Sequence, residues 1–265
     1  MTLHDQSDRR RVPVLGLQVD LCSYDDAIRK IIKLARAGLG GYVSVANVHV
    51  AIEARDDPAF EKLVNDADLV LPDGTPLVWM QRLQGNEDAE QVRGPSLMPM
   101  LMKHAEAEGL SVGFLGARPE VLEQVVVRAA KEFPDLQIPF HFSPPFRAAS
   151  DEEKAATVQA ISESNVQILF VGLGCPKQER WMAENREKVN AVMIGVGAAF
   201  DLYAGNIREA PGVISKLGLE WMFRLVQEPR RLFSRYLLVN PRFIWLAASQ
   251  LIRVRSRPKE PTNND

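Results

Sequence analysis

Short runs of valine, isoleucine and leucine alternate along most of the chain with stretches that carry apolar residues at helical spacing. The helical stretches are about 10–15 residues long. The apolar runs lie at residues 42–46, 68–71, 111–116, 166–174 and 191–197. Such runs are typical of strands in a parallel sheet that is covered on both faces. The sequence therefore predicts an α/β fold, a Rossmann-like, mostly parallel sheet with helices on both faces.

The two ends of the chain depart from this alternation. Residues 1–11 are polar and basic and are predicted to be a disordered N-terminus, ahead of an α/β domain over residues 12–217. Residues 218–257 interleave arginine with bulky apolar side chains and show no strand pattern, which predicts a C-terminal helical appendage. Residues 258–265 form a polar tail.

Composition excludes several classes of protein. The formal net charge is −2, so nothing draws the whole chain toward nucleic acid. Two cysteines, Cys22 and Cys175, are too few for a disulfide scaffold, and the four histidines lack the spacing of a metal site. No segment approaches the roughly 20 apolar residues that a membrane-spanning helix needs, and none has the pattern of a signal peptide. A cytoplasmic protein without a metal site is therefore expected.

Asp73 follows the apolar run 68–71 closely and precedes a predicted helix start. Ligands of parallel α/β sheets gather at the carboxyl ends of the strands, which makes this position a candidate site. An Asp-Gly pair is also a common turn, in which the aspartate bonds its own backbone. Thr75 and Pro76 weaken the turn interpretation, because threonine is a good N-cap and proline suits the first helical position. We therefore favour Asp73 as a free carboxylate that acts as a general base.

The segment GLGCPKQE, residues 172–179, contains a glycine turn but lacks the third glycine of the dinucleotide-binding fingerprint. No nicotinamide cofactor is expected, and no other cofactor is predicted. A glycine turn that opens a helix at Pro176 can instead bind phosphate through backbone N–H groups and the helix dipole. Lys177 and Gln178 would then be side-chain donors. A tight turn with a solvent-facing lysine fits the same pattern equally well.

Three more polar residues lie near predicted strand ends or in a predicted loop, and each has two interpretations. Asn47 belongs either to a site or to the N-cap of the following helix. Arg93 is either a site residue or an ordinary surface arginine. Asp201 either contacts a ligand or caps or pairs locally. None of these signals is specific by itself.

Five segments, taken together and in this order, resemble the WecG/TagA/CpsF family of bacterial glycosyltransferases over roughly residues 12–245. The segments are ADLVLPDGTPLVW, RGPSL, GLGCPKQERWM, GVGAAFDLYAGNIREAP and LEWMFRLVQEPRRLFSRY. The resemblance implies transfer of a sugar of the N-acetylmannosamine type from a UDP-sugar donor to an undecaprenyl-diphosphate-linked saccharide acceptor. It also implies inversion at the anomeric carbon and no obligatory metal. The product would serve the synthesis of a cell-surface polysaccharide.

The resemblance further implies roles for single residues. Asp73 becomes the base. The residues that contact the donor become Asn47, Arg93, Gln178 and Asp201, with Asp201 near the uracil. Three arginines, Arg224, Arg231 and Arg235, are expected to close over the active site and to pair with diphosphate, for which a guanidinium is suited.

The appendage, residues 218–257, carries many arginines and aromatic groups against only two acids, Glu220 and Glu228. Two or three amphipathic helices are predicted, with Pro229 and Pro241 at positions where new helices can begin. This composition favours binding to the anionic inner face of the cell membrane, with about 1 kcal/mol from each basic residue near the surface. The alternative is an ordinary helical subdomain packed on the sheet. Away from lipid, the same helices could pair two copies of the chain.

Two other functions stay open at the level of the sequence. One is a nucleotide-sugar-modifying enzyme such as an epimerase, against which the missing dinucleotide fingerprint argues. The other is a non-enzymatic membrane-surface module that uses the basic C-terminal helices. That second hypothesis leaves the polar residues after the strands unexplained.

Overall fold

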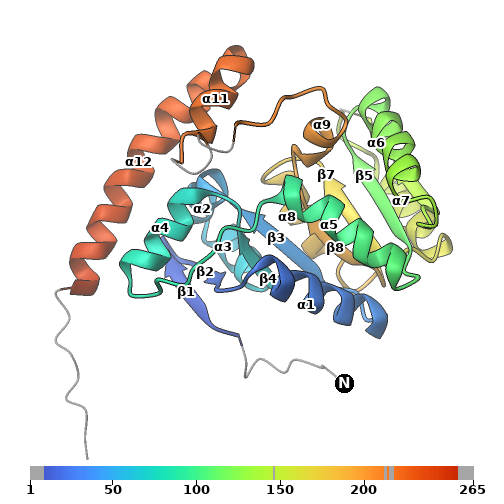
Figure 1. Cartoon of the computed structure of the whole chain (residues 1–265), viewed down its shortest axis with the longest axis horizontal. Helices are drawn as coiled ribbons and strands as arrows, with labels where there is room; N and C mark the ends of the chain where they lie inside the picture. The colour runs from blue at the N-terminus through green and yellow to red at the C-terminus, as the bar shows by residue number, and fades with distance from the viewer. Residues whose placement is uncertain (1–8, 146, 212–213, 215–217, 256–265) are drawn as a thin grey trace, which may run out of the picture.

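The computed structural model describes residues 9–145, 147–211, 214 and 218–255. Within these residues the central element is a six-stranded sheet, in which every pairing is parallel (Figure 1). In spatial order its strands are β4 (Leu69–Pro72), β3 (Tyr42–Ala46), β8 (Val192–Gly195), β7 (Ile168–Gly172), β5 (Val112–Gly116) and β6 (Phe140–Phe142). The expected α/β class is confirmed. The strands other than the edge strand β6 are buried because their valine, isoleucine and leucine side chains face helices on both sides.

Two hydrophobic clusters lie on the two faces of the sheet. The helices of the first cluster are α1 (Tyr24–Ala37), α5 (Gly94–Ala107), α6 (Pro119–Glu132) and α9 (Ala199–Tyr203). The second cluster includes residues of α2 (Val48–Asp56), α3 (Pro58–Asn65), α4 (Thr75–Leu83), α7 (Asp151–Glu163) and α8 (Lys177–Glu184). The sheet is thus covered on both faces, as the continuous apolar runs predicted.

Helix α1 shows how local sequence sets the boundaries of an element. The Ser23 side chain accepts a hydrogen bond from the Asp26 N–H, and the Asp26 carboxylate accepts one from the Ser23 N–H, which together form a capping box. Gly38 ends the helix with a φ of 63°, a left-handed conformation that favours glycine. Between these ends, residues such as Ile28 and Ile31 face the core.

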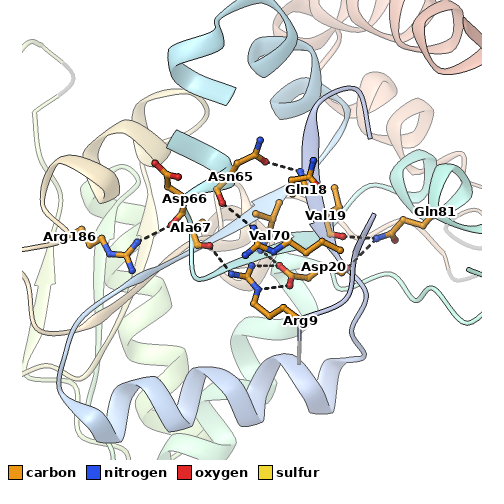
Figure 2. A network of polar contacts seen from close by, with 11 residues as sticks. Arg9, Gln18, Val19, Asp20, Asn65, Asp66, Ala67, Val70, Gln81 and Arg186 are labelled. Carbon is orange, nitrogen blue, oxygen red and sulfur yellow. Dashed lines mark hydrogen bonds and ion pairs between the residues drawn. The ribbon is translucent and has the colours of Figure 1, made fainter. Parts of the chain in front are cut away.

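A β-hairpin of β1 (Arg11–Val14) and β2 (Leu17–Asp20) lies beside β4. The fully buried Asp20 carboxylate pairs with Arg9 at 2.6 Å and accepts the Val70 N–H at 2.7 Å (Figure 2). Order therefore begins before residue 12, contrary to the predicted disorder of residues 1–11, because Asp20 gives Arg9 a buried partner. Residues 1–8 lie outside the described residues, as does the predicted tail 258–265.

The C-terminal part contains α11 (Glu220–Gln227) and α12 (Pro229–Arg255), which lie beside α4 and α2 at the β4 side of the sheet (Figure 1). Pro229 begins α12, as predicted. The expected helix start at Pro241 is wrong, because α12 continues through it. Pro241 is exposed, whereas Leu232 and Phe243 on either side are buried, and we attribute the continuity of the helix to this packing.

Helix α12 is held against the rest of the fold by polar contacts as well. Gln250 accepts the Leu15 N–H at 2.8 Å and donates to the Pro13 carbonyl at 2.7 Å, and Arg242 pairs with Asp56. No helix in the described part of the chain combines the length and apolar character required to cross a bilayer.

Candidate active site

The carboxyl ends of two neighbouring strands, β3 and β4, bring Asn47 and Asp73 together. The Asp73 N–H donates to the Ala46 carbonyl at 2.8 Å, so the chain leaves β4 along the end of β3. Gly74 follows at close quarters, since a Cβ at this position would lie 3.4 Å from the Asn47 Cα. The adjacency of these two polar residues follows from strand order, which the sequence alone does not give.

The Asp73 carboxylate has a structural partner that the sequence did not reveal. Its Oδ1 accepts the Gly94 N–H at 3.0 Å, at the start of α5. The prediction that Thr75 caps α4 is wrong: Gly74 occupies the N-cap with an extended backbone and no side-chain cap, and Thr75 is already helical. Asp73 is therefore fixed in place rather than left free, and a carboxylate has further acceptor capacity beyond this one bond.

The electrostatic surroundings of Asp73 favour proton uptake. Burial raises the pKa of its carboxyl above the ordinary value, and the Gly94 N–H acts in the opposite direction. Of the nearby charges, Glu220 raises the pKa of Asp73, whereas Arg93 and Arg224 lower it. A partly accessible carboxylate with a raised pKa has the character of a general base.

Asp73 lies in a pocket of about 530 Å³ between α2, α4, α11 and α12. The polar lining gathers near Asp73 and includes Asn47, His49, Gln91, Glu220 and Arg224. The remaining wall is mostly apolar and is formed chiefly by α4 and α12. The C-terminal helices thus form one side of the cavity in which Asp73 is found.

Arg93, the N-cap residue of α5, connects this centre to α11. Its Nη2 lies 2.6 Å from Oε1 of Glu220, and both side chains are largely buried. Burial by itself lowers the pKa of Arg93, but the Glu220 and Asp73 carboxylates outweigh it and raise that pKa. The backbone N–H of Arg93 donates to the Tyr24 hydroxyl at 2.9 Å. Arg93 is therefore not an ordinary surface arginine.

Sequence reasoning missed Glu220 and Trp79 as parts of this region. Glu220 is one of only two acids in a basic segment, which was the available signal for an internal ion pair. Trp79 supports the chain just before α11, since a Cβ on Gly218 would lie 2.8 Å from its Cη2 atom. No local pattern marks that contact, because the two residues are far apart in the sequence.

Asn47 lines the pocket and also caps α2. Its Oδ1 accepts hydrogen bonds from the N–H groups of His49 at 3.0 Å and Val50 at 3.3 Å. The side-chain oxygen of Asn47 therefore forms the N-cap that was one of its two interpretations. The cap fixes the side chain next to Asp73 and leaves the amide nitrogen as a donor. His49 follows it on the pocket wall, with its Nδ1 3.8 Å from Glu53.

The glycine turn after β7 opens α8, with Pro176 as the N-cap residue and Lys177 exposed at the first helical position. Gln178 is buried: its Oε1 accepts the Gly174 N–H at 3.2 Å, and its Nε2 donates to Glu179 at 2.9 Å. A Cβ on Gly195 would lie 2.9 Å from that Nε2 atom, so Gln178 lies against the end of β8. The structure thus does not present Gln178 as a free donor beside the turn.

Asp201 lies in α9, after β8, where its carboxylate is 3.9 Å from Arg118. This weak local ion pair agrees with the interpretation that Asp201 caps or pairs locally. Lys177, Gln178 and Asp201 do not line the pocket that holds Asp73. They lie at the same carboxyl edge of the sheet, Asp201 after β8, the neighbour of β3, and Lys177 and Gln178 after β7, one strand farther along.

The three C-terminal arginines divide into two groups. Arg224 of α11 lines the pocket, lies 4.0 Å from Glu228, and has a buried Nε without a hydrogen-bond partner among the described residues. Arg231 and Arg235 belong to α12, but their side chains lie outside the described residues. A search of the described part of the chain for three or more histidine, cysteine, aspartate or glutamate side chains able to hold a metal ion finds none.

Known proteins with similar sequences belong to one family of glycosyltransferases. The model of the glycosyl transferase WecG/TagA/CpsF family matches residues 12–257. An N-acetylglucosaminyldiphosphoundecaprenol N-acetyl-beta-D-mannosaminyltransferase of Bacillus spizizenii is 31% identical over 206 residues, 77% of each chain. Proteins of the same name from Bacillus subtilis and Staphylococcus aureus are 29% identical over 197 residues, 73% of this chain and 74% of the relative, and 27% identical over 235 residues, 88% and 91%.

Proposed function

The chain belongs to the WecG/TagA/CpsF family of glycosyltransferases, and from this premise we propose that it transfers a hexose of the N-acetylmannosamine type from a UDP-sugar. The proposed acceptor is N-acetylglucosamine linked through diphosphate to a polyprenol. The names of the relatives support this pair of substrates. The observation that carries the proposal is the partly accessible carboxylate of Asp73, whose pKa burial raises, at the polar end of a pocket that Arg224 shares.

We propose a single displacement with inversion, in which Asp73 is the general base. A hydroxyl of the acceptor attacks the anomeric carbon of the donor, and the new C–O bond forms as the bond to the UDP oxygen breaks. The electron pair of the broken bond leaves with UDP, and the hydroxyl proton passes to Asp73. The bond from Gly94 holds the carboxylate in position while this proton moves.

The donor is assigned to the carboxyl edge of the sheet, between the ends of β3 and β7. We propose Asn47 and Arg93 as sugar-nucleotide contacts, Lys177 and the N-terminus of α8 as contacts to the diphosphate, and Asp201 as a contact near the uracil. Gln178 acts through its bond to the turn that precedes α8, because its own side chain is buried there. Helix N-termini stabilise anions through their free N–H groups.

Arg224 is proposed to bind the diphosphate of the acceptor, together with Arg231 and Arg235. Its buried and unpartnered Nε, in the wall of the pocket, supports this assignment, because a buried guanidinium gains most from an anionic partner. With arginines and a helix N-terminus facing both diphosphates, we expect the reaction to need no metal. Activity should persist in EDTA, and a loss that Mg²⁺ or Mn²⁺ restores would contradict this expectation.

The outer surfaces of α11 and α12 support peripheral binding to the inner face of the cell membrane. The large apolar side chains exposed there include Val226, Phe233, Leu237 and Trp245. Exposed arginines such as Arg230 and Arg253 accompany them. This surface suits an interfacial position near the lipid-linked acceptor. Binding to anionic liposomes should weaken as salt rises, and indifference of the full chain to such liposomes would count against the assignment.

The experiment for the function combines a panel of UDP-sugars with a polyprenyl-diphosphate-linked N-acetylglucosamine acceptor and identifies the product by mass spectrometry. We expect one added N-acetylhexosamine from UDP-N-acetylmannosamine, and release of UDP that depends on the acceptor. Epimerised donor without transfer would favour a nucleotide-sugar-modifying enzyme instead. Absence of any reaction, while anionic liposomes are still bound, would favour the non-enzymatic module.

A further inference from the structure

The pocket that holds Asp73 continues as an apolar groove between α4 and α12. One wall is a single face of α12, with residues at the spacing of successive helical turns. These residues are Leu232, Tyr236, Val239, Asn240, Phe243, Ile244, Ala247, Ala248 and Leu251. From the first to the last, this face extends about 28 Å at the usual rise of about 1.5 Å per residue. The groove is therefore much longer than a sugar binding site requires.

Helices α4 and α12 are far apart in the sequence, but both line this groove. Near Asp73, the ring of Trp221 in α11 meets Tyr236 of α12 with centroids 5.9 Å apart. At the other end, Gln250 of α12 lies 3.4 Å from Gln84, which directly follows α4. The groove thus begins at the polar centre and leads away from it toward the β1–β2 hairpin, where Gln250 donates to the Pro13 carbonyl.

The opposite wall leaves large apolar side chains open to the groove. Trp79 and Leu83 of α4 are 45% and 55% exposed, and Ile244 on the facing helix is 67% exposed. An apolar lining of this length is unfavourable in water and gains stability when an apolar ligand covers it. The lining is continuous with Arg224 and Asp73, so a ligand that fills it reaches the buried, unpartnered Nε of Arg224 at one end, where an anionic group gains most.

We propose that this groove binds the isoprenoid chain of a polyprenyl diphosphate, with the diphosphate at Arg224 and the attached sugar at Asp73. The order of chemical character along the groove is the order along such a molecule: a hydroxyl-bearing sugar, two phosphates and then a linear succession of apolar isoprene units. The proposal rests on the proposed function for the identity of the sugar. The polyprenyl diphosphate is likewise part of the proposed acceptor, and the groove adds a site for its isoprenoid chain.

The test is a fluorescence titration of the full chain with a dansyl-labelled isoprenyl diphosphate that carries no sugar, kept below its critical micelle concentration. Ala248→Trp fills the groove from α12 at a position that is not buried. The matched control is Ala155→Trp, which introduces the same side chain at an exposed position of α7. Leu83→Gln makes the facing wall polar and serves as a second variant. Thermal unfolding verifies that each variant folds.

We expect Ala248→Trp to weaken binding about 10-fold or more, the factor that corresponds to displacing roughly two buried CH₂ groups. Leu83→Gln should weaken binding as well, whereas Ala155→Trp should bind like the unmodified chain. Inhibition of probe binding by inorganic diphosphate should remain in Ala248→Trp, because the polar end is intact.

Three results would overturn the proposal. The first is no binding of the probe by the unmodified chain, and the second is binding by folded Ala248→Trp and Leu83→Gln that equals that of the unmodified chain. The third is full displacement of the probe by a zwitterionic phospholipid at the same concentration. The titration involves no sugar transfer, so its outcome is separate from that of the transferase assay. A chain that binds the probe in the groove without transferring N-acetylmannosamine would retain this inference and lose the proposed function.

Discussion

Replacement of Glu220 by glutamine tests whether α11 must be docked for the acceptor to react. The Glu220 carboxylate lies 2.6 Å from the Arg93 guanidinium, with side chains 23% and 15% exposed. A hydrogen bond to a charged group contributes about 1.5–3 kcal/mol, and a neutral one about 0.5–1.5 kcal/mol. Glutamine preserves the shape and one hydrogen bond, so the change should weaken docking of α11 by about 1–1.5 kcal/mol.

A loss of that size changes the ratio of docked to undocked α11 by about 5–10-fold, since about 1.4 kcal/mol corresponds to a factor of ten. Arg224 reaches the pocket from α11, whereas Asn47 and the glycine turn before α8 belong to the sheet domain. Where the undocked state becomes appreciably populated, kcat/KM for the lipid-linked acceptor should fall by up to that factor. The Kd of UDP, measured by calorimetry, should stay unchanged.

The pH profile gives an independent readout of the same substitution. The negative charge of Glu220 helps to raise the pKa of Asp73, and Arg93 lowers it. Removal of the Glu220 charge should therefore lower the pKa of Asp73 and move the rising limb of kcat/KM toward lower pH. Glu123→Gln, an exposed charge change on α6, is the control and should leave both limbs in place.

A double-mutant cycle with Arg93→Gln separates the two roles assigned to this arginine. We expect a coupling between the two changes in the acceptor kcat/KM and none in the affinity for UDP. Unchanged acceptor kinetics and an unmoved pH limb in Glu220→Gln would refute the reasoning. So would an equal loss of UDP affinity and acceptor use, because it would place Glu220 in the donor site.

Two further changes test the framework around the site. Asp20→Ala removes the buried partner of Arg9. We expect the free energy of unfolding, measured by urea denaturation, to fall by about 3–5 kcal/mol. A fall below about 1 kcal/mol would contradict the role of this buried pair. Iodoacetamide should modify Cys175 before Cys22, because burial raises the pKa of Cys22 to about 12. Bound UDP should slow the modification of Cys175, because this residue lies in the turn that precedes α8. Labelling of Cys175 at an unchanged rate in saturating UDP would count against a donor diphosphate at that turn.

The sequence predicted the elements that depend on local chemistry. Apolar runs specified the strands, and Pro229 specified the start of α12. The position of Asp73 at a strand end followed from the same pattern. These features depend on side-chain periodicity and backbone preference within a few residues.

The contacts that make Asp73 a site could not be predicted in this way. Its bond to Gly94 joins two elements 21 positions apart, and the pair of Arg93 with Glu220 spans 127 positions. Both depend on which strands and helices become neighbours. The Thr75 prediction failed by one residue, because Gly74 already has the extended conformation of an N-cap and leaves threonine inside the helix.

The removal of one carboxylate gives the most direct test of the central claim. Asp73→Asn should still accept the Gly94 N–H through its amide oxygen, so fold and UDP affinity should be retained. The raised pKa of Asp73 means that its ionisation opposes folding, so native stability is lost as pH rises through that pKa. The variant should therefore be at least as stable as the unmodified chain at neutral and alkaline pH.

The decisive measurement is turnover of Asp73→Asn with UDP-N-acetylmannosamine and the lipid-linked acceptor across a range of pH. We predict a fall of about 10²–10⁴-fold, the usual range for removal of an acid–base group, and loss of the rising limb that the unmodified chain shows through the pKa of Asp73. Turnover equal to that of the unmodified chain, with the same rising limb, would contradict the account and make Asp73 a cap for α5 alone.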